Sequence, residues 1–311
     1  MTTNHLQRVL TDLGLEYHSA LQLLNMLGAP EPPVFQSPFS ALLWLETMTQ
    51  AYWLRKPGIE HWQQQDHGTL IAARREINTL LQKLGVLTEI RPKCQHYGTV
   101  LVIGGYAANF QARLNFLEEL WLSDVHFNRI YLLGRQRPLA QREEIQWLKP
   151  GAAATESNMM LAQYHATREH WPTAMQTIPC VIVSAPNAQA ELAQSIHAST
   201  SDMTHFWWQE MQDLPAPTKQ QCFADLLQSI LVIGNQPYLR YQHAVIKREL
   251  TFLTQQARLA MPAMETVGPS ALENEYAAHV LDSLARYIYT EYSKLERCYL
   301  NKEDASREAA I

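Results

Sequence analysis

The sequence predicts an α/β fold: a Rossmann-like parallel sheet of at least four strands, flanked by helices, with helical extensions at the N- and C-terminal ends. Two observations predict it. Four short runs between residues 99 and 233 are apolar throughout rather than alternating, as is typical of strands covered on both faces. Each run is separated from the next by a stretch with helical character, and strands that alternate with helices form parallel sheets with right-handed crossovers.

The first ninety residues are predicted to be helical. Leucines recur every three or four positions from Leu6 to Leu27, and Gly28 ends that helix or helix pair. A second apolar helix is expected from about Leu42 to Tyr52. A third is expected from Gly68 to Leu84, with Gly85 as its C-cap.

The four predicted strands each end in small or polar residues; they span residues 99–103, 130–133, 179–183 and 230–233. The stretches predicted to be helical between and after them are residues 107–121, 155–170, 200–212 and 242–259. One more long helix is expected over residues 270–297, followed by a charged tail. The chain is therefore divided into a helical N-terminal extension (1–95), a Rossmann-like domain (96–260) and a C-terminal helix with tail (261–311).

Composition narrows the classes of function. Of the 311 residues, 47% are hydrophobic and 18% charged, which is typical of a globular protein. The net charge of -5 argues against nucleic acid as a partner, because phosphate binding needs a concentrated basic face. No apolar run approaches membrane-spanning length, and the polar N-terminus does not have the pattern of a signal peptide. We expect a cytoplasmic protein, with export by another route left open by the charged tail.

Motifs for common catalytic and metal sites are absent from the sequence. It contains no GxSxG, HExxH, Walker lysine loop or calcium loop. The four cysteines (Cys94, Cys180, Cys222 and Cys298) form no CxxC pair, so no metal site is predicted.

Residues at the predicted strand ends are the candidate site, because ligands of open parallel sheets bind beyond the carboxyl ends of the strands. Gly104 and Gly105 either let the backbone approach a ligand or simply form a tight turn. Arg113 and Arg135 each have the chemistry to hold a phosphate or carboxylate in a bidentate fork. The alternative for Arg135 is a surface charge, and the alternative for Arg113 is a surface charge or an intramolecular salt bridge. The predicted pocket lies between the turns at Gly104, Arg135, Ser184 and Asn235.

Further candidates lie at helix starts and after the last strand. Thr155 and Glu156 lie at the start of a predicted helix. Thr155 is either an N-cap or a ligand contact, and Glu156 is either an acid favoured by the helix dipole or a ligand contact. Asn235 and Gln236 follow a buried strand and either form a turn or make hydrogen bonds to polar groups of a ligand. His197, His205 and His243 are expected near the rim of the site, where a lone histidine is more often a surface residue than a catalyst.

The order of these pieces resembles the YdcF-like family of domains of unknown function, which includes SanA and ElyC. The resemblance covers about residues 98–250. The matching pieces are a strand that ends in Gly104 and Gly105, Arg113 on the next helix, a strand that ends in Gly134 and Arg135, the Thr155–Glu156 pair followed by Met159 and Met160, a helix start at Ser199, Thr200, Ser201 and Asp202, and a last strand that leads into Asn235, Gln236, Pro237 and Tyr238.

The resemblance implies a Rossmann-like fold with a polar pocket at the strand ends, and S-adenosylmethionine as a candidate cofactor. It adds Gly134, Thr200 and Tyr238 to the expected ligand-binding residues. Two departures bear on activity. Leu133-Gly134-Arg135 stands where the family has Ser-Gly-Gly, and Gln236-Pro237-Tyr238 replaces its common histidine after the last strand.

Two functions follow as hypotheses. The first is a protein or enzyme that binds a nucleotide-like or phosphorylated metabolite, in which Glu156 and Asp202 are acid–base groups or hydroxyl ligands. The second is a non-catalytic interaction protein whose helical extensions contact a protein partner. Aromatic residues of the N-terminal helices favour the second hypothesis unless they only cover the sheet; they are Trp44, Tyr52, Trp53 and Trp62.

Overall fold

The computed structural model describes residues 5–56, 59, 63–139, 146–186, 198–272 and 275–308, with side chains described up to residue 296. The chain forms two compact units. An α/β unit comprises residues 89–235 and 245–269, and a helical unit comprises residues 1–88, 236–244 and 270–311. The predicted helical extensions from the two ends of the chain thus belong to one unit.

The α/β unit contains a parallel sheet of five strands in the order β3-β2-β1-β4-β5, which confirms the predicted fold class. All strand carboxyl ends therefore lie along one edge of the sheet. The strands are β1 (His96–Ile103), β2 (His126–Arg135), β3 (Cys180–Ala185), β4 (Ile230–Ile233) and β5 (Met264–Val267).

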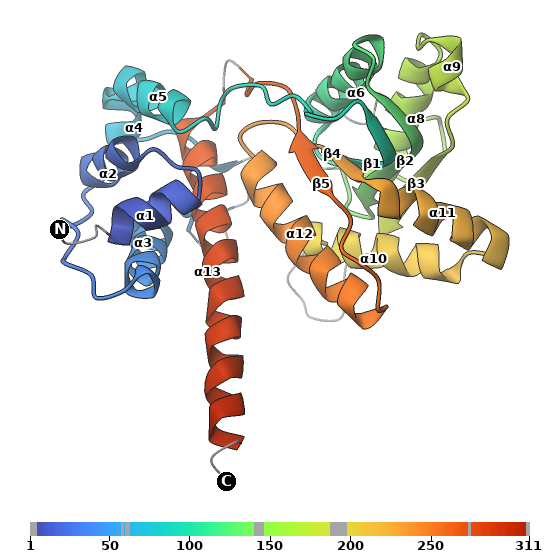
Figure 1. Ribbon diagram of the computed structural model, residues 1–311. Coiled ribbons are helices and arrows are strands. Elements are labelled where there is room, and N and C mark those ends of the chain that lie inside the picture. The colour runs from blue at the N-terminus through green and yellow to red at the C-terminus, as the bar shows by residue number, and fades with distance from the viewer. Residues whose placement is uncertain are drawn as a thin grey trace. The chain divides into compact units, whose positions relative to one another are not determined.

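Helices cover both faces of this sheet (Figure 1). Alternate residues of the central strands enter the two cores: Val100 and Val102 of β1 face one, and Leu101 and Ile103 face the other. Burial on both faces explains why these strands are apolar throughout. The first face is covered by α6 (Ala107–Leu122), α8 (Glu156–Arg168) and α9 (Thr173–Gln176), and the second by α10 (Thr200–Asp213), α11 (Ala216–Gln228) and the later part of α12 (Leu239–Gln256).

Three elements of this unit were not predicted: α9, α11 and β5. The strand β5 pairs with β4 at the edge of the sheet, within the segment that we assigned to the C-terminal extension. Its sequence, Met-Glu-Thr-Val, has no apolar run, and three of its four residues are only half-buried. An edge strand needs less apolar surface than a central one, which removes the signal that predicted the other four.

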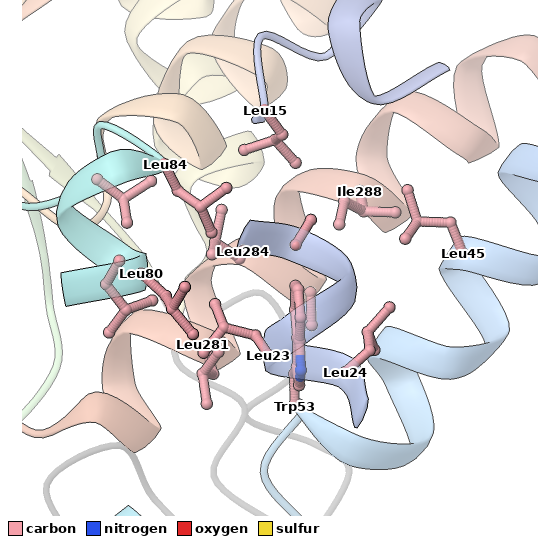
Figure 2. Packing of buried hydrophobic residues seen from close by; sticks show 14 of the residues in the cluster. Leu15, Leu23, Leu24, Leu45, Trp53, Leu80, Leu84, Leu281, Leu284 and Ile288 are labelled. Carbon is pink, nitrogen blue, oxygen red and sulfur yellow. The ribbon is translucent and has the colours of Figure 1, made fainter. Parts of the chain in front are cut away.

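The helical unit has its own hydrophobic core (Figure 2). Leucines of the N-terminal helices pack with Leu281, Leu284 and Ile288 of α13, and α13 contacts α3 and α5. Gly85, the predicted C-cap, follows α5 with a φ of +67°, in the left-handed region that glycine adopts at low cost. The helices are α1 (His5–Asp12), α2 (Tyr17–Met26), α3 (Pro38–Tyr52), α4 (Thr69–Ala72), α5 (Arg74–Lys83) and α13 (Ala277–Glu308).

The aromatic residues of the N-terminal helices contribute mainly to this core. Trp53 is only 3% exposed and lies among Leu23, Leu24 and Leu281 in Figure 2. Trp44 packs against the same core and against Phe35. Tyr52 is exposed, and Trp62 lies outside the described residues. Most of the aromatic surface that suggested a protein-binding face is thus buried within the unit itself.

Candidate functional site

The strand order places a topological switch point between β1 and β4. The chain moves from β1 outward to β2 and β3, then returns to the other side of β1 to form β4 and β5. Ligands of open α/β sheets bind in the crevice that such a reversal leaves at the carboxyl edge. Gly104 follows β1 and Asn235 lies shortly after β4, so both residues are at this position.

Arg113 fills the switch point from within the protein. Its side chain comes from α6 and is only 2% exposed. Its guanidinium donates hydrogen bonds to the carbonyl oxygens of Ile103 and Gly104 and to Oδ1 of Asn235, with an Nε–Oδ1 distance of 2.9 Å. Arg113 and Asn235, two predicted ligand residues, therefore bind each other and join the ends of β1 and β4.

The glycines at the strand ends make room for neighbouring protein atoms. A Cβ added to Gly104 would lie 2.5 Å from Oε1 of Glu156 and 2.8 Å from the carbonyl oxygen of Leu133. A Cβ at Gly134 would lie 2.9 Å from the sulfur of Met160, and one at Gly105 would lie 3.2 Å from the Arg113 guanidinium. Close packing of α8 and of Arg113 thus accounts for the glycines that we predicted to approach a ligand.

A buried carboxylate with two arginines lies at the ends of β2 and β3. Glu156, the first residue of α8, has no exposed surface, and the N-terminus of a helix favours its negative charge. Arg135 donates to both of its oxygens, at 3.1 and 2.8 Å, and Arg137 donates to Oε2 at 2.9 Å. The guanidinium of Arg137 also lies 5.4 Å from the ring centroid of Tyr106. We call Arg135, Arg137 and Glu156 the arginine–glutamate cluster.

Arg135 is the accessible member of this cluster. Its side chain is 24% exposed, against 8% for Arg137. Its Nη1 also donates to the carbonyl oxygen of Ala198, just before α10. The structure thus brings Arg135 and Glu156 together, as the predicted site requires.

Two hydroxyl groups lie between α8 and β3. The Ser157 and Ser184 oxygens are 2.7 Å apart, close to the cluster because Ser184 pairs with Gly134 in the sheet. Thr155 is the N-cap of α8, and its hydroxyl accepts a hydrogen bond from the Asn158 amide at 3.4 Å. Ser184 therefore lies at the predicted site, whereas Thr155 has a capping role.

Asp202 and Thr200 belong to the start of α10. Asp202 and Ser199 form a capping box, in which the Asp202 carboxylate accepts from the Ser199 amide at 2.7 Å and from its hydroxyl at 2.8 Å. The Thr200 carbonyl oxygen accepts from the Thr204 hydroxyl at 2.8 Å. These contacts are those of an ordinary helix start.

Gln236 and Tyr238 belong to the helical unit. Gln236 is fully buried and donates to the carbonyl oxygens of Gly85 and Thr88 at 3.2 and 2.8 Å. The Tyr238 hydroxyl donates to Glu275 at 3.4 Å. Of the polar residues predicted after the fourth strand, only Asn235 thus lies in the α/β unit.

A groove of about 440 Å³ opens beside the end of β3. Of the three histidines predicted near the rim, His197 lies outside the described residues and His243 belongs to the helical unit. His205 lines the groove, and its Nε2 lies 2.8 Å from Oε2 of Glu249 on α12, a partner that the sequence does not indicate. Because the two residues are 44 positions apart and on different helices, no local sequence pattern predicts their contact. We call this the α10 groove; it is lined by Ala185, Pro186, Asp202, His205, Phe206, Trp208, Gln209, Leu253 and Gln256.

Glu249 is held as a carboxylate. Burial by itself raises the pKa of Glu249, but hydrogen bonds from His205, Arg248 and Ser201 outweigh it, so the pKa lies below the usual range.

By contrast, burial raises the pKa of the Cys180 thiol to about 12, which leaves it protonated and unreactive at neutral pH.

Two classes of site are not found among the described residues. No group of three or more histidine, cysteine or acidic side chains there is arranged to hold a metal ion. Within the same ranges, no helix combines the length and the apolar character needed to cross a membrane.

Comparisons with protein-family models, with curated proteins and with solved structures found no match. The resemblance to the YdcF-like family therefore stays a prediction, and the functional argument depends on the geometry of the site.

Proposed function

We propose that the α/β unit binds a small anionic molecule, either phosphorylated or nucleotide-like, at the carboxyl ends of β2 and β3. The arginine–glutamate cluster is the observation that carries this proposal. Two guanidinium groups share one buried carboxylate, and the more exposed of them, Arg135, lies at the sheet edge where α/β proteins bind their ligands.

The cluster suits an anion because of its charge and geometry. Arg135 and Arg137 carry two positive charges against the single negative charge of Glu156. Glu156 orients the planar Arg135 group through two hydrogen bonds, so little side-chain entropy is lost when this partly exposed group binds a phosphate or carboxylate. The starts of α8 and α10 add partial positive charge on the same side.

The proposal is one of binding rather than of acid–base catalysis. Glu156, predicted as a catalytic group, has no exposed surface and is paired with two arginines. Asp202, the other predicted group, uses its Oδ2 to cap α10. S-adenosylmethionine, which the family resemblance suggests, belongs to the nucleotide-like ligands to be tested.

A thermal-shift screen tests the proposal. The panel contains inorganic phosphate, ribose 5-phosphate, nucleotides, nucleotide sugars and S-adenosylmethionine. A ligand at a hundred times its Kd stabilises the folded protein by about 2.7 kcal/mol, which raises the Tm by roughly 5–10 °C in a domain of this size. The Arg135→Ala variant should lose the shift.

Arg91→Ala is the matched control. Arg91 also belongs to the α/β unit and also pairs with two carboxylates, those of Glu89 and Glu119, but these lie away from the cluster. Its replacement should leave the ligand-induced shift intact. An absence of any anion-induced shift in the wild type, or an equal loss in both variants, contradicts the proposal.

A further inference from the structure

The α10 groove has the size and lining of a ligand pocket. Its volume of about 440 Å³ falls within the usual range of roughly 300–1,000 Å³ for small-molecule sites. Phe206, which is half-buried, provides aromatic surface, and the mostly buried Trp208 lies in the groove wall. Polar groups of Asp202, His205 and Gln209 lie beside them. A mainly apolar wall with a few polar groups suits a planar ring that carries hydrogen-bonding atoms.

His205 differs from the other histidine that is paired with a glutamate. His279 in the helical unit is 9% exposed and uses both ring nitrogens, one with Glu275 and the other with the Gln64 carbonyl oxygen at 3.0 Å. The His205 side chain is 42% exposed and lines the groove. In the described part of the chain its one hydrogen bond runs from Nε2 to Glu249. Glu249 thus orients the His205 ring and leaves Nδ1 available.

The groove lies next to the arginine–glutamate cluster at the carboxyl edge of the sheet. Ala185, which lines the groove, pairs with Arg135 in the sheet, and neighbouring strands lie about 4.8 Å apart. Arg135 also donates to the carbonyl oxygen of Ala198, two residues before α10 begins. The side chain of Arg135 and the lining of the groove are therefore neighbours through β3 and through the start of α10.

We infer that the α10 groove binds a planar heteroaromatic ring joined to the anion that Arg135 holds, and that Nδ1 of His205 hydrogen-bonds that ring. This inference rests on the proposed function and adds the class of ligand to it. Asp202 lines the groove at the start of α10, and in this inference its carboxylate accepts hydrogen bonds from hydroxyl groups of the portion that links the ring to the anion.

Two probes separate this inference from the proposed function. Ribose 5-phosphate offers only the anion and the hydroxyls, whereas adenosine 5′-monophosphate offers a heteroaromatic ring as well. Isothermal titration of the full chain should show the monophosphate binding at least tenfold more tightly than the sugar phosphate. Equal affinities, both lost in Arg135→Ala, overturn this inference and leave the proposed function standing. If neither probe binds, this inference fails, and the proposed function fails with it when no other anion of the thermal-shift panel stabilises the protein.

Filling the groove is the second test. Gln256 is exposed at the groove wall, and its neighbour Gln255 is exposed on the same helix outside the groove. Gln256→Trp should remove the tenfold advantage of the monophosphate, with sugar phosphate binding unchanged, whereas Gln255→Trp should preserve it. An advantage that survives in Gln256→Trp contradicts a ring in this groove.

The third test addresses His205. His205→Ala should weaken binding of the monophosphate by about fivefold, the contribution of one hydrogen bond, and leave the sugar phosphate unaffected. His205→Asn should restore part of the loss, because an asparagine amide can occupy the position of Nδ1. The unfolding curve of each variant is recorded alongside. An unchanged monophosphate affinity in His205→Ala shows that this side chain only holds Glu249.

Discussion

The two halves of the sheet's carboxyl edge each contain a predicted anion-binding arginine, and the structure uses them differently. Arg113, at the ends of β1 and β4, is 2% exposed and donates to oxygens of the protein itself. The Arg135 side chain, at the end of β2, is 24% exposed and pairs with Glu156. An arginine near a strand end is thus a ligand contact only where the packing leaves part of it accessible.

The largest expected effect comes from removing the buried arginine. Arg113→Ala leaves the carbonyl oxygens of Ile103 and Gly104 and the amide of Asn235 without their donor, in a buried site. Unsatisfied buried groups and the cavity together should cost about 3–5 kcal/mol of unfolding free energy. Chemical denaturation measures it. A decrease in unfolding free energy of less than about 1 kcal/mol contradicts the structural role of Arg113. The ends of β1 and β4 would then again be a candidate binding site.

The next effect tests the carboxylate that organises the other half. Glu156→Gln preserves the shape of the side chain but leaves the two guanidinium groups of Arg135 and Arg137 without their shared negative charge. Breaking such a buried pair from one side should destabilise the protein by about 3 kcal/mol. Chemical denaturation under the same conditions measures this loss of unfolding free energy. Stability equal to that of the wild type would mean that the carboxylate is not paired as described.

A smaller effect on stability is expected for the accessible arginine. Arg135→Ala leaves the buried Glu156 paired with Arg137, so it should cost less than Glu156→Gln, about 1 kcal/mol, while binding of the anion is lost. Arg113→Ala should therefore lower the stability more than Arg135→Ala does, whereas Arg135→Ala should weaken anion binding more than Arg113→Ala does. If Arg135→Ala is as unstable as Arg113→Ala, the two halves of the edge do not differ in the way proposed.

The smallest effect is a change of stability with pH that involves Glu249 near the groove. Its folded pKa is lower than its unfolded value of about 4.3 because of hydrogen bonds from His205, Arg248 and Ser201. The stabilisation is therefore complete above pH 4.3 and is lost as the pH falls through the lower, folded value. Denaturation of the wild type and of Glu249→Gln between pH 3 and 6 should give curves that converge at low pH. Parallel curves would exclude a lowered pKa.

Much of the sheet was predictable because its central strands are buried on both faces. The runs that became β1, β2, β3 and β4 are apolar throughout, and the observed strands start or end within a few residues of the predicted ones. The edge strand β5 was missed because Glu265 and Thr266 interrupt its apolar pattern. The edge at which Gly104, Arg135 and Ser184 lie was predictable as well, since parallel strands bring their carboxyl ends to one edge.

The residue pattern alone predicts the alternation of strands and helices, and with it the edge at which Gly104, Arg135 and Ser184 lie. Long-range packing determines that Arg113 is bound internally, that Gln236 belongs to the helical unit, and that Glu249 orients His205. The two differ because the underlying interactions act over different ranges. Backbone periodicity and apolar burial act over a few neighbouring residues, whereas the partner of a buried charge comes from a distant segment that local pattern does not identify.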